Sequence, residues 1–437
     1  SEEPFFEPLR KAVDNLKIRL SYGSLGNQQI GYYDFIQTIT TKGSMSDYSF
    51  DGTVLGQHAT VSDPVSGDQT WEKVVSKNLG LDLNMFNNRL SLTTDFYIRD
   101  TKGILGKGKS LPSIYGASEP QMNANNLRTK GYELVLGWRD SFKLAGSTFS
   151  YGITGTFSDY TAEYTKCDNP TGLIGDPYVG KKYGEIWGYK VDGLFRNDKE
   201  AAEYASRIDL STVASGYYTA TGAYGKGVRG GDIKYLDLNG DNIVNGGKGT
   251  LDDPGDRRVI GNSSPRYQYG ASLNFSWYGF DVSVFMQGIG RLDWYPGADN
   301  LRFWGPYCRP YATFVPKNFM SQVWSESNPD AYLPRARAYT SLNSTQGTAY
   351  YTNDRYLQNL AYCRLKNLTL GYTIPKRLTS KVGIKECRVY FSGENLATWS
   401  ALKNDFLDPE QAAADSDKKS NVYPWCRTYS VGLNLTF

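Results

Sequence analysis

Residues 79–98 read LGLDLNMFNNRLSLTTDFYI, and this stretch decides the fold. Every second residue from Leu79 to Met85 is apolar, and the residues between them are small or polar. After the pair Asn87-Asn88 the alternation resumes at Leu90 and continues to Ile98. Strict alternation indicates a β-strand with one apolar and one polar face. Asn tolerates the positive φ angles of tight hairpins, so the stretch predicts two antiparallel strands joined by a short turn.

The same period of two recurs along the whole chain. The further alternating stretches are 16–22, 132–138, 149–157, 267–277, 280–286, 368–374, 389–391 and 429–437. Together with the hairpin they predict roughly ten strands of about ten residues, the length that crosses a bilayer when a strand is tilted. The chain is therefore predicted to be all-β and antiparallel.

The connections between these stretches alternate between short and long. Short turns are expected near 86–89, 140–147, 277–279 and 375–385. The long connections are 24–78, 100–129, 159–265, 290–361 and 395–425. Outer-membrane β-barrels sort their connections in this way, with short periplasmic turns and long extracellular loops. A soluble β-protein with one face in a core is the alternative interpretation.

In a membrane barrel the apolar stripe faces lipid and the polar stripe faces a wet lumen. The residues expected to face the lumen are Lys17, Arg19, Asp82, Asp95 and Glu133. The aromatic residues expected in the two interfacial girdles are Tyr22, Trp138, Trp277 and Tyr372. Ten strands alone would enclose little space, so we expect further strands and a plug outside residues 1–437.

Composition agrees with this class. The 437 residues include 48 Lys and Arg against 45 Asp and Glu, a formal net charge of 48 − 45 = +3, which is a poor electrostatic match for nucleic acid. The hydrophobic share of 40% excludes a disordered chain. A mean hydropathy of −0.50 excludes long apolar helices, but half of each barrel strand faces water by construction.

Several ordered stretches resemble the SusC/RagA family of TonB-dependent outer-membrane transporters. They are Asn15–Gly23 with Gly26-Asn27-Gln28, Trp71-Glu72-Lys73 with Asn78–Asp82, Gly231–Tyr235 with Asp237–Asp241, Arg258–Gly261 with Pro265, Arg364–Tyr372 and Ser392–Leu396. Each motif is weak alone, but the ordered set covers nearly the whole chain.

The resemblance implies the C-terminal part of a 22-stranded barrel in the outer membrane of a Gram-negative bacterium, with the plug and the TonB box outside this chain. It implies TonB-driven import of oligosaccharides, the favoured substrate class, or of oligopeptides, with a SusD-like surface lipoprotein as partner. The terminal Tyr429, Leu433, Leu435 and Phe437 resemble the signal that barrel-assembly machinery reads. The alternatives are a passive channel or autotransporter barrel and a soluble, secreted glycan-binding protein.

The stretch 237–243 resembles the start of a calcium loop. Asp237, Asn239 and Asp241 supply oxygens at alternate positions, and the Ile243 carbonyl would add a fourth. Lys248 stands where an EF-hand would need its Glu, and in the family resemblance Asp256, with Asp253 as runner-up, closes the loop. The sequence predicts one structural divalent cation, Ca²⁺ or Mg²⁺; the alternative is an Asx-turn without metal.

Two aromatic groups in the long connections are candidates for contact with substrate or with the lid lipoprotein. They are Trp304, Tyr307, Arg309 and Tyr311 in one connection, and Tyr217 and Tyr218 in another. Flat aromatic faces suit sugar rings and peptide backbones, and Trp, Tyr and Arg are the usual anchors of protein interfaces. Packing within the loops is the third interpretation of each residue.

No catalytic residues are predicted. His58 is the single histidine, and no Gly-x-Ser-x-Gly elbow accompanies it. Carboxylate pairs such as Asp252-Asp253 are ordinary turn residues. The chain is therefore not expected to be an enzyme.

Overall fold

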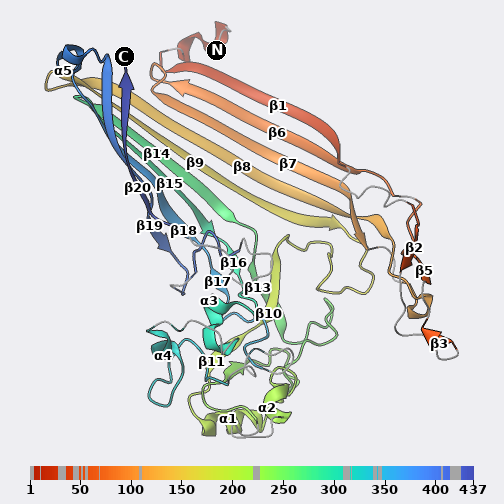
Figure 1. Cartoon of the computed structure of the whole chain (residues 1–437). Helices are drawn as coiled ribbons and strands as arrows, with labels where there is room; N and C mark the ends of the chain where they lie inside the picture. The colour runs from red at the N-terminus through yellow and green to blue at the C-terminus, as the bar shows by residue number, and fades with distance from the viewer. Residues whose placement is uncertain are drawn as a thin grey trace.

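The computed structural model describes residues 4–9, 11–27, 36–42, 49–50, 53–54, 58–67, 69–107, 111–219, 227–308, 315, 317–337, 342, 347–404, 407–413 and 425–437. Its dominant element is one antiparallel sheet of ten strands in the order β1-β6-β7-β8-β9-β14-β15-β18-β19-β20 (Figure 1). The strands are β1 (Val13–Asn27), β6 (Glu72–Met85), β7 (Leu90–Lys107), β8 (Gln121–Leu144), β9 (Ser147–Lys166), β14 (Arg266–Trp277), β15 (Phe280–Arg291), β18 (Tyr362–Thr373), β19 (Glu386–Ser400) and β20 (Thr428–Thr436). The prediction of about ten antiparallel strands is confirmed.

The strands are longer than the sequence pattern predicted. The expected length was about ten residues, whereas β8 has 24 and β9 has 20. The backbone pairing of these strands continues past the apolar stretch toward the long connections, for example at Arg128↔Glu163. Hydrogen bonding needs no apolar side chain, so the alternation marks only the part of each strand that would face lipid.

The four short turns lie at one end of the sheet, as predicted. The backbone of Asn87 and Asn88 has φ of 57° and 59°, and Ala145-Gly146 and Tyr278-Gly279 also have positive φ at both positions. Two-residue hairpins favour such left-handed pairs because their twist matches that of the strands. The fourth turn contains two short helices, α5 (Lys376–Thr379) and η5 (Ser380–Val382).

Cross-strand register aligns the apolar residues on one face of the sheet. Ile18 lies opposite Leu81, and Thr94 opposite Leu134, which in turn lies opposite Phe157. Many of these side chains are exposed, including Ile18 at 64% and Val431 at 79%. A broad exposed apolar face of this kind needs a non-aqueous environment.

The apolar band has the height of a membrane. On β8 it runs from Leu144 to Tyr132, twelve residues or about 40 Å along the strand. At a tilt of about 45° this spans roughly 28 Å, close to the height of the apolar band of outer-membrane barrels. Aromatic pairs gather at the short-turn end, with ring centroids 6.3 Å apart for Phe86–Trp138 and 4.5 Å apart for Phe280–Tyr372.

The long connections form a separate layer at the other end of the strands (Figure 1). Small elements build it: β10 (Glu185–Tyr189) pairs with β13 (Arg257–Asn262), β11 (Val191–Leu194) with β12 (Ile233–Tyr235), and β16 (Asp293–Trp294) with β17 (Gln358–Asn359). Its helices are α1 (Asp198–Ala205), α2 (Ser215–Thr219), α3 (Leu301–Trp304), η3 (Gly305–Tyr307) and α4 (Phe319–Gln322). We call residues 167–265 and 292–361 the loop layer.

The remaining elements lie near the N-terminal strands. They are η1 (Pro4–Leu9), η2 (Ser113–Tyr115), and the pairs β2 (Ile39–Lys42) with β5 (His58–Val61) and β3 (Ser49–Phe50) with β4 (Thr53–Val54). In the described part of the chain, every helix falls short of the length and apolar character that a bilayer crossing requires.

Candidate functional site

The polar face of the sheet carries a continuous set of ion pairs. Arg19 on β1 donates to both oxygens of Asp82 on β6 and to both oxygens of Asp95 on β7, at 2.9 to 3.1 Å. The prediction that these residues share one face is confirmed. Gly80 lies beneath this fork; a Cβ there would come within 2.6 Å of the Arg19 Cζ. The pairs are partly exposed and screened by solvent, so their main effect is a rigid hydrophilic wall.

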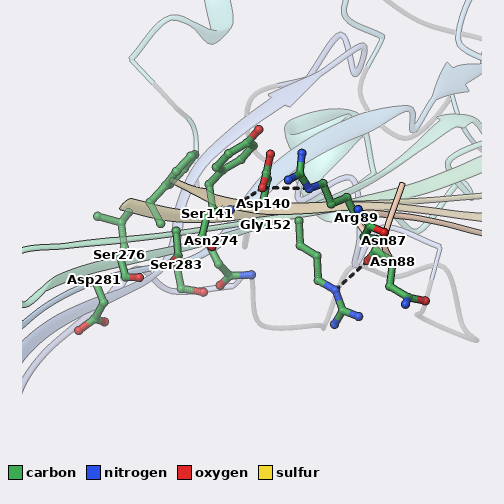
Figure 2. Close-up of a pocket in the computed structure, with 15 residues that line it drawn as sticks. Asn87, Asn88, Arg89, Asp140, Ser141, Gly152, Asn274, Ser276, Asp281 and Ser283 are labelled. Atoms are coloured by element: carbon green, nitrogen blue, oxygen red, sulfur yellow. Dashed lines mark hydrogen bonds and ion pairs between the residues drawn. The ribbon is translucent and has the colours of Figure 1, made fainter. Parts of the chain in front are cut away.

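Two hollows lie along this wall. One, of about 660 Å³, is close to the short turns and is lined by Asn88, Arg89, Asp140, Asn274 and Asp281, among others (Figure 2). The Arg89–Asp140 ion pair crosses it at 3.3 Å. The second, of about 520 Å³, lies over β8, β9, β14, β15 and β18. Its lining includes the polar residues Glu133, Thr156, Ser158, Gln268 and Gln287 and the aromatic residues Phe157, Tyr269, Phe285 and Tyr362. Hydroxyl, amide and aromatic groups together suit an uncharged polar oligomer.

The connection between β19 and β20 folds back onto this wall. Arg364 of β18 is 2% exposed and donates to Asp408 and Glu410, both at 2.6 Å. Lys366 also binds Glu410 at 2.8 Å, and Gln287 donates to the same carboxylate at 3.2 Å. Leu407 and Ala412 of the same segment pack into the core of the loop layer. We call residues 407–413 the latch segment, because it ties the loop layer to the sheet.

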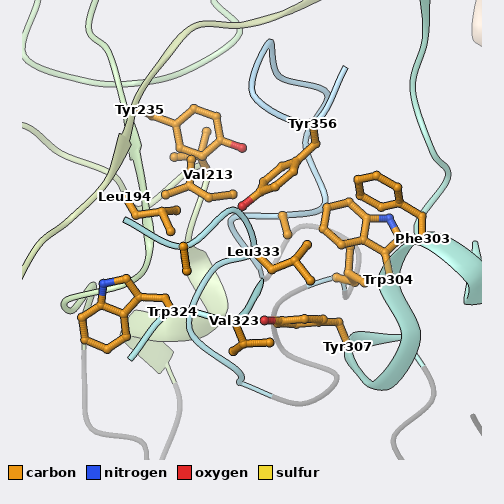
Figure 3. Close-up of a cluster of buried hydrophobic side chains, with 14 of the residues drawn as sticks. Leu194, Val213, Tyr235, Phe303, Trp304, Tyr307, Val323, Trp324, Leu333 and Tyr356 are labelled. Atoms are coloured by element: carbon orange, nitrogen blue, oxygen red, sulfur yellow. The ribbon is translucent and has the colours of Figure 1, made fainter. Parts of the chain in front are cut away.

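The loop layer has its own hydrophobic core (Figure 3). Phe303 and Trp304 pack edge-to-face with Tyr356, at centroid distances of 6.3 and 5.1 Å. The buried phenols keep hydrogen bonds to backbone carbonyls: Tyr307 donates to Pro334 and Tyr235 to Thr348, each at 2.5 Å. Burial raises the pKa of these phenols well above the usual value, so they stay neutral donors.

Three of the predicted contact residues lie in this core. Trp304, Tyr307 and Tyr217 are 0%, 2% and 1% exposed, so their rings offer no surface to a substrate or a lid protein. The prediction of ligand or lid contact is wrong for these three, and the packing interpretation is correct. The backbone of Tyr218 belongs to α2. Arg309 and Tyr311 lie outside the described residues.

A buried ion pair fixes the core. Arg337 donates to both oxygens of Asp232 at 3.0 and 2.6 Å, and the two side chains are 3% and 1% exposed. The Arg337 guanidinium also lies 4.1 Å from the centre of the Tyr217 ring. Burial raises the pKa of Asp232 to about 6 in spite of this cation. No local sequence pattern predicts this pair, because 105 residues separate its members.

The Asp232 pKa predicts a pH dependence of loop-layer stability. Asp232 binds its proton more tightly in the folded state than in the unfolded one, so its contribution is present below about pH 4 and is lost as the pH rises through about 6. The free energy of unfolding falls by roughly 3 kcal/mol over this pH range. Chemical denaturation monitored by Trp fluorescence should show that Asp232→Asn removes this component of the slope between pH 4 and 6. An unchanged slope would contradict the assignment.

In the predicted metal loop, aspartate carboxylates accept hydrogen bonds from backbone N–H groups of the loop. Asp256 is fully buried and accepts from the N–H groups of Leu238 and Asn245 at 2.7 and 2.9 Å, so its carboxylate joins two parts of the loop. The choice of Asp256 over Asp253 as a cation ligand stays a prediction. Asp237 accepts from Gly240 and Asn242.

Two further bonds leave few loop oxygens available to a cation. Asp241 Oδ1 accepts from Ile243 N–H at 2.8 Å, and Asn239 Oδ1 accepts from Asp241 N–H at 3.1 Å. Over the described residues, no group of three or more His, Cys, Asp and Glu side chains is placed to hold a metal ion. The loop geometry therefore stands without a cation, and metal binding stays a prediction.

The C-terminal strand presents the predicted assembly residues. Tyr429, Leu433, Leu435 and Phe437 are between 41% and 73% exposed. In the described sheet β20 pairs with β19 alone, and β1 pairs with β6 alone, so both are edge strands. Closure of the barrel by further strands, and the role of the four residues in assembly, remain predictions.

Comparisons with known proteins agree with the fold. No protein-family model matches the chain. The chain is 26% identical over 448 residues to TonB-dependent receptor P3 of Formosa agariphila, which covers 97% of this chain and 40% of the receptor. It is 21% identical over 450 residues to TonB-dependent receptor SusC of Bacteroides thetaiotaomicron, and this match covers 100% of this chain and 39% of SusC.

A solved structure of a transporter has a similar fold. The chain superposes on the RagAB peptide transporter with a TM-score of 0.66 and 21% identity, over 98% of this chain and 41% of that one. It thus spans about two fifths of the length of these relatives, which fits a portion of a larger barrel. The chain is thus similar along its length to TonB-dependent receptors, SusC among them, and its fold is similar to that of the RagAB peptide transporter.

Proposed function

We propose that this chain forms the wall and the extracellular mouth of an active importer of nutrient oligomers. The observation that carries the proposal is the division of the ten-stranded sheet into an exposed apolar face and an ion-paired polar face. The polar wall supplies a hydrated path, and its two hollows supply charged, polar and aromatic contacts along that path. A passive channel would share the wall; the similarity to TonB-dependent receptors favours energised uptake.

Oligosaccharides are the first substrate candidate and oligopeptides the second. RagAB is described as a peptide transporter, and that description belongs to RagAB. A SusD-like lipoprotein over the mouth and TonB on the periplasmic side are the proposed partners, as in the SusC/RagA relatives. We propose no catalytic role, since the named relatives are receptors and transporters.

The test is uptake by cells that carry or lack the gene. Cells should take up labelled oligosaccharides, or failing that labelled oligopeptides, only when both this protein and the proton gradient are intact. Uptake that survives collapse of the gradient would support the passive channel. Absence of uptake for both substrate classes would contradict import of oligomers.

The divalent cation on the 237–243 loop is a separate proposal with its own test. Carboxylate oxygens keep a second lone pair after accepting one N–H, and hard cations use such oxygens. Elemental analysis of dialysed protein should find one Ca²⁺ or Mg²⁺ per chain that disappears in Asp237→Asn/Asp241→Asn. Protein without a bound divalent ion, and with the same melting temperature in calcium and in chelator, would support the metal-free Asx-turn.

A further inference from the structure

The apolar face of the sheet holds a groove with a basic rim. The groove has a volume of about 810 Å³ and lies over β1, β6, β7 and β8. Leu20, Leu79 and Phe96 form its apolar floor, and Lys77 and Lys130 also line it. Lysine is uncommon on the lipid-facing surface of a barrel, because a charge near the bilayer centre costs about 2–4 kcal/mol.

Register places both lysines at the edge of the apolar band. Lys77 lies opposite Ile98, and Ile98 opposite Lys130, so the two lysines share one cross-strand row about 10 Å apart. The next row toward the short turns contains Leu79, Phe96 and Tyr132. The lysines therefore lie on the long-connection side of the apolar surface, at the level of the outer-leaflet headgroups.

Neither lysine has a partner of its own. Lys77 and Lys130 are both exposed, and in the described part of the chain neither forms an ion pair or a hydrogen bond. The nearby carboxylates each hold another cation. Asp100 binds Arg128 at 2.7 Å, and Glu163 binds Lys182 at 2.5 Å. Asp159, which lines the groove together with Arg266, binds that arginine at 2.5 Å.

A second pair of lysines lies farther out. Lys73 and Lys102 are directly opposite each other on β6 and β7. Facing like charges destabilise a strand pair unless an anion lies between them. The surface thus has an excess of positive charge on β6, β7 and β8 next to the groove.

We propose that this groove binds an anionic lipid of the outer leaflet, with its phosphorylated headgroup on Lys77 and Lys130 and an acyl chain on the floor. The two features suit one amphiphilic ligand: an apolar floor for hydrocarbon and, one row farther out, two unneutralised ammonium groups. Basic clusters at the membrane surface attract anionic headgroups in this way. The inference rests on the membrane orientation of the sheet and not on the transported substrate.

The experiment measures lipid binding to the intact outer-membrane protein in a neutral detergent. The probes are diphosphorylated lipid A and the same lipid without phosphates. Native mass spectrometry measures how much of each lipid stays bound to the protein. We expect Lys77→Gln/Lys130→Gln to weaken binding of the diphosphorylated lipid by about 10-fold or more, since each surface lysine contributes about a factor of five. Lys77→Arg/Lys130→Arg should keep the affinity within about 3-fold, because the charges remain.

The matched control is Lys381→Gln/Lys385→Gln, which removes two exposed lysines at the short-turn end. It should leave lipid binding unchanged. Equal loss in both double variants, or no loss in Lys77→Gln/Lys130→Gln, would overturn the proposal. Equal binding of the phosphate-free lipid would overturn the role of the headgroup. Displacement of the lipid by millimolar inorganic phosphate would overturn the role of the apolar floor.

Discussion

Arg337→Met is expected to destabilise the loop layer by about 3–5 kcal/mol. The substitution keeps the side-chain length but leaves the Asp232 carboxylate 1% exposed without its cation. Among the described residues, the only other hydrogen-bond donor to that carboxylate is the backbone N–H of Arg229, at 2.7 Å. An unpaired buried charge costs several kcal/mol, which is more than the loss of the pair itself. Thermal unfolding, together with proteolysis of the loop layer, measures the effect.

An exposed ion pair provides the control. Arg196 is 72% exposed and lies 3.6 Å from Asp330, so Arg196→Gln should cost less than about 1 kcal/mol. The double variant Arg337→Met/Asp232→Asn should recover part of the loss, because the stranded charge is gone. Equal melting temperatures for Arg337→Met and Arg196→Gln would contradict the buried-pair interpretation.

Arg364→Gln is expected to release the latch segment from the sheet. Arg364 is 2% exposed and holds two carboxylates at 2.6 Å, and it also donates to Thr398 at 2.9 Å. Removal of this cation leaves the Asp408 carboxylate with the backbone N–H of Glu410 but without a cation, while Glu410 keeps Lys366. A cost of about 3 kcal/mol would raise the open fraction of the segment roughly 100-fold.

The rate of cysteine labelling measures how often the latch segment leaves the sheet. A cysteine at Gln411 should react with a membrane-impermeant maleimide at least about 10-fold faster in the Arg364→Gln background. Arg388→Gln is the matched control, because Arg388 binds Asp281 on the same wall and, in the described part of the chain, forms no ion pair or hydrogen bond with the latch segment. Equal acceleration in both backgrounds, or none in either, would contradict the latch.

The sequence was sufficient to predict the features that depend on neighbouring residues. The alternation from Leu79 to Ile98, the positive-φ turn at Asn87-Asn88 and the shared polar face of Arg19, Asp82 and Asp95 are all present. Local periodicity determines each of these features, because side chains of a strand alternate between two faces. Asp256 is assigned to the metal-like loop by the family resemblance and not by local periodicity; its carboxylate accepts the Leu238 N–H.

The loop layer could not be predicted in the same way. Its core joins residues as distant as Tyr189 and Tyr351, and its ion pair joins Asp232 with Arg337. No periodic pattern encodes such contacts, so the sequence leaves substrate contact, lid contact and packing within the loops all open for Trp304 and Tyr307, which are core residues. A signal was present: these connections are rich in Trp, Tyr and Leu, which is typical of a packed core.

The most direct test of the membrane orientation is a scan of β8 with spin labels at positions 133 to 138 in the protein reconstituted in lipid bilayers. Labels at 134, 136 and 138 should be accessible to oxygen, which partitions into lipid, because Leu134, Leu136 and Trp138 lie on the apolar face. Labels at 133, 135 and 137 should be accessible to a water-soluble nickel chelate. Opposite phase, or no alternation across the six positions, would contradict a sheet with one face in lipid and the other in a hydrated lumen.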